Sequence, residues 1–217
     1  MEIIWHGHSF FKIITKNKNE KIIIAIDPFS SELGLRVPKI EADILLISHN
    51  HFDHNNKAAI SGNYFLIEHQ GEYEVKNVLI KAIKSFHDNK EGKERGENLM
   101  FTIESENLKI CHMGDFGQEK LTEKQSEEIG SVDVLMIPVG GKFTISANEA
   151  TNIIEELEPR IVIPMHYGLP KLKLKLDPVE RFLKSFGIKS LVPEKRLSIK
   201  KEHLSKDETK IVLLEII

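Results

Sequence analysis

A run of histidines directly follows a strongly apolar segment of this chain. Residues 48–56 read SHNHFDHNN, and they come after ADILLI at residues 42–47. Each imidazole carries two polar nitrogens that need hydrogen-bond or metal partners once water is excluded. A chain that places these side chains at the end of a buried strand is constrained to fold around a polar cluster. Its members are His49, His51, Asp53 and His54.

The spacing within this run is typical of metal ligands. Alternate residues of a strand point to the same side, so His49 and His51 can share one ligand. Asp53 and His54 follow where the chain turns toward NNKAAI (residues 55–60), where we expect a helix to start, and this pair can reach a second point. Neutral imidazole together with carboxylate suits two cations held close together. The alternative is a histidine-rich polar loop that is solvated by water.

Further ligands are expected where other apolar segments end, because one loop cannot complete two metal shells. His87 ends VLIKAIKSF, Asp115 follows LKICHMG, and His166 follows RIVIPM. An open α/β sheet normally binds its ligands beyond the ends of its strands. Taken singly, each residue could be a capping or core residue. Together with the histidine run they make five histidines and two aspartates that converge by pattern.

Composition limits the class of protein. A chain of 217 residues with 41% hydrophobic content can bury the core of one large domain. The net charge of −3 does not favour nucleic-acid binding by bulk electrostatics. The single cysteine, Cys111, leaves no intramolecular disulfide, as is usual in the cytosol. The first residues do not read as a signal peptide, and no apolar stretch is long enough to span a membrane. We therefore expect a cytoplasmic globular protein.

The order of predicted elements indicates an α/β class with one domain over residues 1–217. Helices are expected at residues 121–130, 146–159 and 177–187. The second opens with a capping box of Ser146 and Glu149, and the third has Asp177 as N-cap with Pro178 at the first helical position. Strands with helices laid outside them make a layered α/β domain. The predicted strands cover residues 2–7, 10–15, 21–26, 42–47, 64–69, 77–83, 98–104, 108–113, 132–139 and 160–165.

The motif HNHFDH at residues 49–54 resembles the HxHxDH signature of the metallo-β-lactamase superfamily. The resemblance runs in that family's order along essentially the whole chain. It continues through WHGHSFF, IDPF, FHDNKEGKERGEN, CHMGDFG, IPVGGKFTIS and IPMHYG. The chain is similar to the branch of small zinc-dependent hydrolases that includes ascorbate-6-phosphate lactonase-like proteins. This resemblance implies a four-layer αββα sandwich with a metal site at one edge.

The resemblance also implies roles for individual residues. His49, His51 and His87 are expected to bind one divalent metal ion. Asp53, His54 and His166 are expected to bind a second, with Asp115 bridging the two. Zinc fits this histidine-rich set best, with manganese or iron as alternatives. The implied activity is hydrolysis of an ester, lactone or phosphodiester by a metal-bridging hydroxide, with Asp53 as both ligand and catalytic proton acceptor.

Other residues near these motifs have two interpretations each. His8 and His112 either lie behind the ligands or contact substrate, or they are structural histidines. The loop from His87 to Asn98 is expected to border the opening of the site. Within it, Arg95 either binds an anionic substrate or belongs to a solvated loop with local ion pairs. Asp27 is expected to hydrogen-bond the loop behind the ligands. Gly140 and Gly141 either approach the substrate or make a tight turn.

Rival functions remain within this superfamily. Flavin-linked di-iron members usually carry glutamate at the position of His51, which favours hydrolysis here, and a binding module would be expected to have lost ligands. The alternative is a metal-binding protein of the same fold with a redox or non-catalytic role. We expect a small-molecule, anionic substrate and neither a nucleic-acid nor a membrane partner. The sequence sets neither the substrate nor the oligomeric state.

Overall fold

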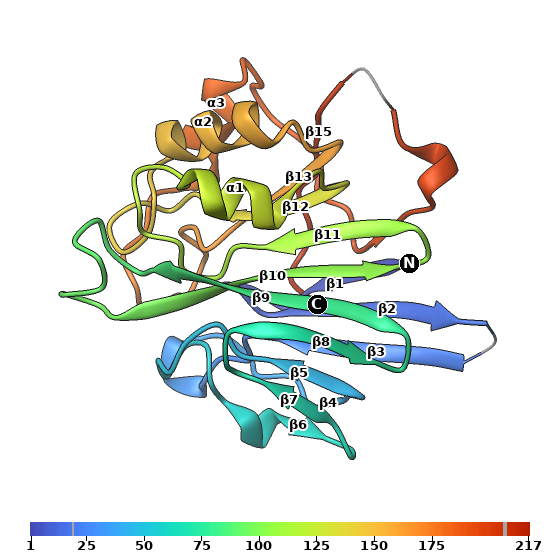
Figure 1. Ribbon diagram of the computed structural model, residues 1–217. Coiled ribbons are helices and arrows are strands. Elements are labelled where there is room, and N and C mark those ends of the chain that lie inside the picture. The colour runs from blue at the N-terminus through green and yellow to red at the C-terminus, as the bar shows by residue number, and fades with distance from the viewer. Residues whose placement is uncertain (19, 206–207) are drawn as a thin grey trace.

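Two β-sheets packed face to face form the centre of the computed structural model, which describes residues 1–18, 20–205 and 208–217 (Figure 1). The six-stranded sheet has the order β14-β1-β2-β3-β5-β7, and the seven-stranded sheet has the order β15-β13-β12-β11-β10-β9-β8. The first comprises β1 (Glu2–Trp5), β2 (Phe11–Asn17), β3 (Glu20–Ile26), β5 (Ile44–Leu46), β7 (Phe65–Ile67) and β14 (Leu197–Ser198). The second comprises β8 (Gly71–Val75), β9 (Val78–Phe86), β10 (Glu97–Ser105), β11 (Leu108–His112), β12 (Val134–Pro138), β13 (Ile161–Met165) and β15 (Lys210–Ile211).

Hydrophobic patterning explains this arrangement. Every residue of β5, β12 and β13 is buried, as expected for apolar strands covered on both faces. In β2, buried and half-buried residues alternate, so one face of that strand points into the space between the sheets. The main core cluster contains Ile24 and Leu46 of one sheet together with Phe101 and Ile110 of the other. Burial of these side chains therefore joins the two sheets.

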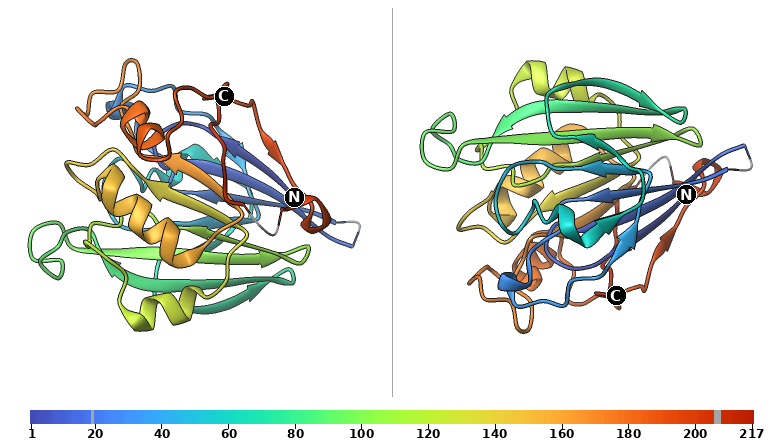
Figure 2. Two further views of the ribbon diagram at one scale, coloured as in Figure 1. Left: turned by 90° about the horizontal axis from the view of Figure 1, so that it is seen from above. Right: turned by 90° about the horizontal axis from the view of Figure 1, so that it is seen from below.

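The two outer faces are covered differently. Helices α1 (Glu123–Ile129), α2 (Ala147–Leu157) and α3 (Val179–Ser185) lie side by side on the seven-stranded sheet (Figure 2). The six-stranded sheet is covered by 3₁₀ turns at Ser31–Leu33 and Lys57–Ala59 and by a small sheet of β4 (Ile40–Glu41) and β6 (Ile60–Ser61). A third 3₁₀ turn spans Lys201–His203. In the part of the chain that the structure describes, no helix has the length and hydrophobicity to cross a membrane.

The predicted capping box of α2 is confirmed. The Ser146 hydroxyl accepts a hydrogen bond from the amide of Glu149, and the Glu149 carboxylate accepts one from the amide of Ser146. The helix buries Ala150, Ile153 and Ile154, which lie on one face at helical spacing. This face attaches α2 to the sheet.

Two local predictions are wrong. Asp177 is not the N-cap of α3, because its backbone amide donates to the Gly140 carbonyl and its carbonyl accepts from the Gly168 amide, both at 2.8 Å. Pro178 caps the helix with φ −72° and ψ 153°, and α3 begins at Val179. NNKAAI does not start a helix but makes only the 3₁₀ turn Lys57–Ala59, since the chain then enters β6 and pairs with β4.

Candidate metal centre

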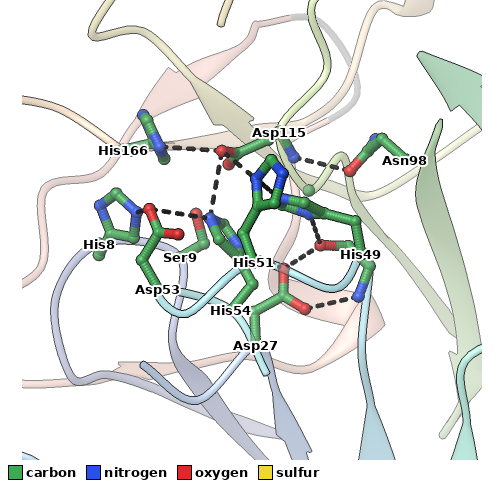
Figure 3. A network of polar contacts seen from close by, with 12 residues as sticks. His8, Ser9, Asp27, His49, His51, Asp53, His54, Asn98, Asp115 and His166 are labelled. Carbon is green, nitrogen blue, oxygen red and sulfur yellow. Dashed lines mark hydrogen bonds and ion pairs between the residues drawn. The ribbon is translucent and has the colours of Figure 1, made fainter. Parts of the chain in front are cut away.

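The seven predicted ligands converge at one edge of the sandwich, beyond the ends of strands. Figure 3 labels six of them, all except His87. The histidine run follows β5, and His87 directly follows β9. Asp115 lies after β11, and His166 directly follows β13. Strands far apart in the sequence therefore deliver their polar side chains to one place.

Asp115 lies at the centre of this cluster. Its Oδ2 atom is 3.1 Å from His54 Nε2, 3.2 Å from His87 Nε2 and 3.1 Å from His166 Nε2. It is also 4.0 Å from His49 Nε2. One carboxylate oxygen thus contacts histidines that come from three separate segments of the chain.

The remaining donor atoms divide into two groups. The first group consists of His49, His51 and His87, whose ligand atoms lie within 4.8 Å of one another. The second group meets the same distance limit and consists of His8, Asp53, His54 and His166. A further set of this kind, His49, His54 and Asp115, connects the two groups. The two groups match the two ligand sets expected from the sequence, with His8 as an additional member of the second.

Several buried polar atoms in the cluster fit a cation. His54 Nε2 and Asp115 Oδ1 have no hydrogen-bond partner among the described residues, although that nitrogen lies 3.1 Å from the other carboxylate oxygen. Ring nitrogens of His49 and His51 face each other at 2.9 Å. Buried nitrogen and oxygen lone pairs that point at one another need a proton or a metal ion between them. The donor set of imidazole and carboxylate is the one that transition metals such as zinc prefer.

The electrostatics of the cluster favour the same interpretation. Burial alone would raise the pKa of Asp115, but His166 and His54 hold that pKa well below its usual value. Burial would likewise raise the pKa of Asp53, but the hydrogen bond from His8 keeps it low. Burial, helped by the charge of His54, holds the pKa of His49 well below its usual value. The carboxylates are therefore ionised and His49 is neutral, which are the forms that bind cations.

A cavity of about 460 Å³ opens in front of the cluster. Polar side chains of the cluster line it on one side, and the apolar side chains Phe52, Phe143 and Leu174 line it as well. Glu94 and Arg95 also border it. The prediction that the loop after His87 borders the opening of the site is therefore confirmed.

Comparison with known proteins assigns the chain to a family. The model of the beta-lactamase superfamily domain matches residues 2–166. The chain belongs to this superfamily. UPF0173 metal-dependent hydrolases of Thermococcus onnurineus and Pyrococcus abyssi are 32% and 33% identical to it, each over 86% of this chain and 92% of the relative. A candidate Zn-dependent hydrolase of the metallo-β-lactamase superfamily from Thermotoga maritima has 35% identity and a TM-score of 0.78, covering 98% of this chain and 97% of that one.

The resemblance and the fold class inferred from the sequence are thereby confirmed. The protein is a hydrolase of the metallo-β-lactamase superfamily, and its His/Asp cluster is able to bind metal. The two face-to-face sheets, with α1, α2 and α3 on the outer face of the seven-stranded sheet, form the sandwich of that fold.

In this superfamily member, Asp27 orients one histidine of the cluster. Its Oδ2 atom accepts hydrogen bonds from His54 Nδ1 at 3.0 Å and from the Ser48 hydroxyl at 2.6 Å. Its Oδ1 atom accepts one from the Ser48 amide at 2.7 Å. The expected bonds to the loop are confirmed, and the bond from His54 Nδ1 to Asp27 orients the ring so that Nε2 faces the cluster.

Asn98 was not identified from the sequence as a site residue. Its Oδ1 atom accepts a hydrogen bond from the Asp115 amide at 2.9 Å. Its side-chain amide donates to the Met113 carbonyl at 2.9 Å and to the Ser85 hydroxyl at 2.7 Å. Asn98 thus holds the turn that carries Asp115. An asparagine at the start of an apolar strand gives no signal of this role.

Two glycines allow the backbone to approach the predicted ligands closely. A Cβ atom on Gly140 would lie 2.0 Å from the carbonyl oxygen of His166, and one on Gly117 would lie 2.4 Å from the carbonyl carbon of His87. Gly140 therefore packs against the backbone of a candidate ligand. Gly141 has φ 58°, and its carbonyl accepts a hydrogen bond from the Phe143 amide, so Gly141 makes a tight turn.

The two remaining histidines near the site differ in position. His8 Nε2 contacts Asp53 Oδ2 at 3.1 Å, and its ring centroid lies 4.0 Å from that of His166. His112 is fully buried, with one nitrogen accepting from the Gly114 amide and the other facing the Ser9 carbonyl. His112 does not line the cavity, so a supporting position is the one its contacts favour.

Proposed function

We propose that this protein hydrolyses an ester, lactone or phosphodiester bond with two divalent metal ions. The observation that carries the proposal is the position of Asp115 Oδ2, within 3.2 Å of ring nitrogens from both groups of the cluster. One ion is assigned to His49, His51 and His87, and the other to Asp53, His54 and His166. Asp115 would be shared between the two ions, because its negative charge would offset the repulsion between neighbouring cations.

Each part of the site has a task in this reaction. Bound at these residues, divalent metal ions would lower the pKa of a water molecule toward neutrality and would offset the negative charge that develops on the substrate. Asp53, which is ionised and contacts His8 Nε2, would accept the proton that this water loses when it attacks the substrate. The apolar side chains of Phe52 and Phe143 border the cavity and limit the access of water to the reacting bond.

Zinc is the metal that we assign to the site, with manganese and iron as alternatives. Histidine-rich ligation favours zinc over magnesium or calcium. The Thermotoga maritima relative is described as Zn-dependent, which supports the same assignment. A small-molecule substrate and a cytoplasmic location are part of this proposal, supported by the size of the cavity and by the free thiol of Cys111.

A substrate screen with defined metal loading tests the proposal. The purified protein is stripped with a chelator, reconstituted with zinc, manganese or iron, and assayed on phosphodiesters, lactones and carboxylic esters. We expect turnover of at least one class that disappears with the chelator and returns with metal. Two bound metal ions without hydrolysis of any class would contradict the proposal. That result would instead favour a redox or non-catalytic protein of the same fold.

A further inference from the structure

Arg95 borders the cavity and has no carboxylate partner among the residues that the structure describes. The other cations of its loop are paired, Lys90 with Glu94 at 2.5 Å and Lys93 with Glu91 at 3.6 Å. For the half-buried Arg95 guanidinium, no ion pair or side-chain hydrogen bond occurs within the described ranges. A planar cation that is held beside a cavity and left unpaired is suited to binding an oxyanion.

Phe143 holds this guanidinium in place. The Arg95 Cζ atom lies 5.3 Å from the centroid of the Phe143 ring, within the range of a cation–π contact. The Lys142 ammonium lies 5.2 Å from the same centroid and likewise has no carboxylate partner in the described part of the chain. Two positive charges therefore lie near one aromatic ring, and of these two cations Arg95 is the one that borders the cavity.

The backbone of the loop is fixed relative to the cluster. The Asp88 carboxylate accepts hydrogen bonds from the amides of Lys90, Gly92, Glu94 and Arg95, at 2.8, 2.9, 2.9 and 2.7 Å. Asp88 directly follows His87, whose own amide donates to the Gly96 carbonyl at 3.1 Å. Arg95 is thus held at a set position relative to His87. This order distinguishes the loop from a solvated surface loop.

The cavity combines three kinds of surface. Its polar lining includes Asp115 and His166, its apolar side chains are Phe52, Phe143 and Leu174, and Arg95 supplies a positive charge beside Glu94, whose carboxylate is paired with Lys90. Phe52 is 49% exposed, which is unusual for a large apolar side chain beside a buried polar cluster. A ligand that covers Phe52 while it reaches Arg95 must have both an apolar part and an anionic part.

We propose that Arg95 binds an anionic group of the substrate at a distance from the bond that is cleaved. The substrate class is an ester or lactone that carries a carboxylate or phosphate group and an apolar segment resting on Phe52, Phe143 and Leu174. The position of the cleaved bond at the metal cluster rests on the proposed function. The anion subsite rests on the unpaired guanidinium and is tested without turnover.

A binding measurement on the metal-loaded protein tests the subsite directly. Calorimetry compares adipate with hexanoate, and glutarate with pentanoate. The members of each pair differ only in one terminal carboxylate. Any binding of the shared carboxylate to metal therefore contributes equally to both affinities and cancels in their ratio. Of adipate and glutarate, we expect the one that binds more tightly to exceed its monocarboxylate in affinity by about ten- to a hundredfold, which is the effect of one charge-assisted hydrogen bond. The preference should vanish in Arg95→Gln and persist in part in Arg95→Lys.

Lys93→Gln is the matched control, because it removes an exposed cation of the same loop that does not border the cavity. Its dicarboxylate preference should equal that of the wild type. Equal or undetectable binding of both members of each pair in the wild type would overturn the subsite. A preference that is unchanged in Arg95→Gln would also overturn it, since the second carboxylate would then contact metal.

Kinetics on matched substrates separate this inference from the proposed function. The 4-nitrophenyl hemiester of adipic acid is compared with 4-nitrophenyl hexanoate. We expect kcat/KM to favour the anionic ester in the wild type and Lys93→Gln but not in Arg95→Gln. Hydrolysis of both esters at equal rates would overturn the subsite and leave the hydrolase intact. Selective dicarboxylate binding without any hydrolysis would do the reverse.

Discussion

Asp27 and His54 form a hydrogen-bonded pair whose members are both fully buried, with Asp27 Oδ2 3.0 Å from His54 Nδ1. The carboxylate would be costly to bury without partners, and its other bonds go to Ser48, next to His49. Asp27 directly follows strand β3, so the pair links the end of this strand to the histidine run after β5. It also sets which nitrogen of His54 faces Asp115.

Asp27→Asn should weaken metal binding without unfolding the protein. The amide keeps the size of the carboxylate but loses the charge that holds the proton on His54 Nδ1. We expect metal affinity and kcat/KM to fall about 10- to 100-fold, the usual effect of removing such a partner. Competition with a chromogenic chelator measures the affinity. The control is Asp43→Asn, whose carboxylate binds Lys76 and the Ile23 amide away from the site. Equal affinities in both variants would contradict the role of Asp27.

Asn98→Ala should lower stability and metal affinity together. The substitution leaves the Asp115 amide and the Met113 carbonyl buried without partners. We expect a loss of about 1–3 kcal/mol in the free energy of unfolding, measured with urea, and a released metal ion. Asn17→Ala is the control, because its exposed side-chain amide donates to the Lys76 carbonyl, away from the site. A stable Asn98→Ala protein with full metal content would show that Asp115 needs no such support.

Gly140→Ala should displace His166 by steric contact. A methyl group there would lie 2.0 Å from the His166 carbonyl oxygen, so the backbone must move. We expect destabilisation of about 1–3 kcal/mol and weaker binding of one metal ion. Gly187→Ala serves as control, because a Cβ atom there would have no neighbour within 4 Å among the described residues. Its expected destabilisation comes from the positive φ of 68° alone. Normal metal content in Gly140→Ala would refute the close packing as a requirement for the site.

Asp88→Asn should loosen the loop that carries Arg95. The neutral side chain accepts the four backbone amides more weakly than the carboxylate does. We expect amide hydrogen exchange of residues 90–95 to accelerate about tenfold or more, while the strands keep their protection. Mass spectrometry of exchange measures this effect. Glu91→Gln, an exposed residue of the same loop, should exchange like the wild type. Unchanged exchange in Asp88→Asn would mean that other contacts order the loop.

The cluster could be predicted because each of its members lies in or directly after a strong apolar pattern. His87, Asp115 and His166 each follow a strand of seven-stranded β-sheet, and strand ends on one edge meet in space. Hydrophobic patterning places such strands reliably. The order of the motifs along the chain then indicated the superfamily, and the superfamily implied the αββα sandwich fold.

The supporting contacts could not be predicted, because they join segments that the local pattern does not relate. Asn98 binds the Asp115 amide across two strands, and Gly140 packs against His166 from another loop. Asp177 failed as an N-cap because tertiary hydrogen bonds to Gly140 and Gly168 outweigh its local capping preference. The missing ion-pair partner of Arg95 could not be predicted either, because only the three-dimensional structure shows which charges of its loop pair with each other.

The metal content of Asp115→Asn tests the central claim most directly. The asparagine keeps the shape of Asp115 but removes the negative charge and one good oxygen donor between the two histidine groups. Elemental analysis after reconstitution should find about two metal ions per chain in the wild type and about one, or a second held far more weakly, in the variant. The apolar strands should keep the variant folded, and its hydrolysis should fall by several orders of magnitude. Two tightly bound ions in Asp115→Asn, or none in the wild type, would contradict the bridged metal centre.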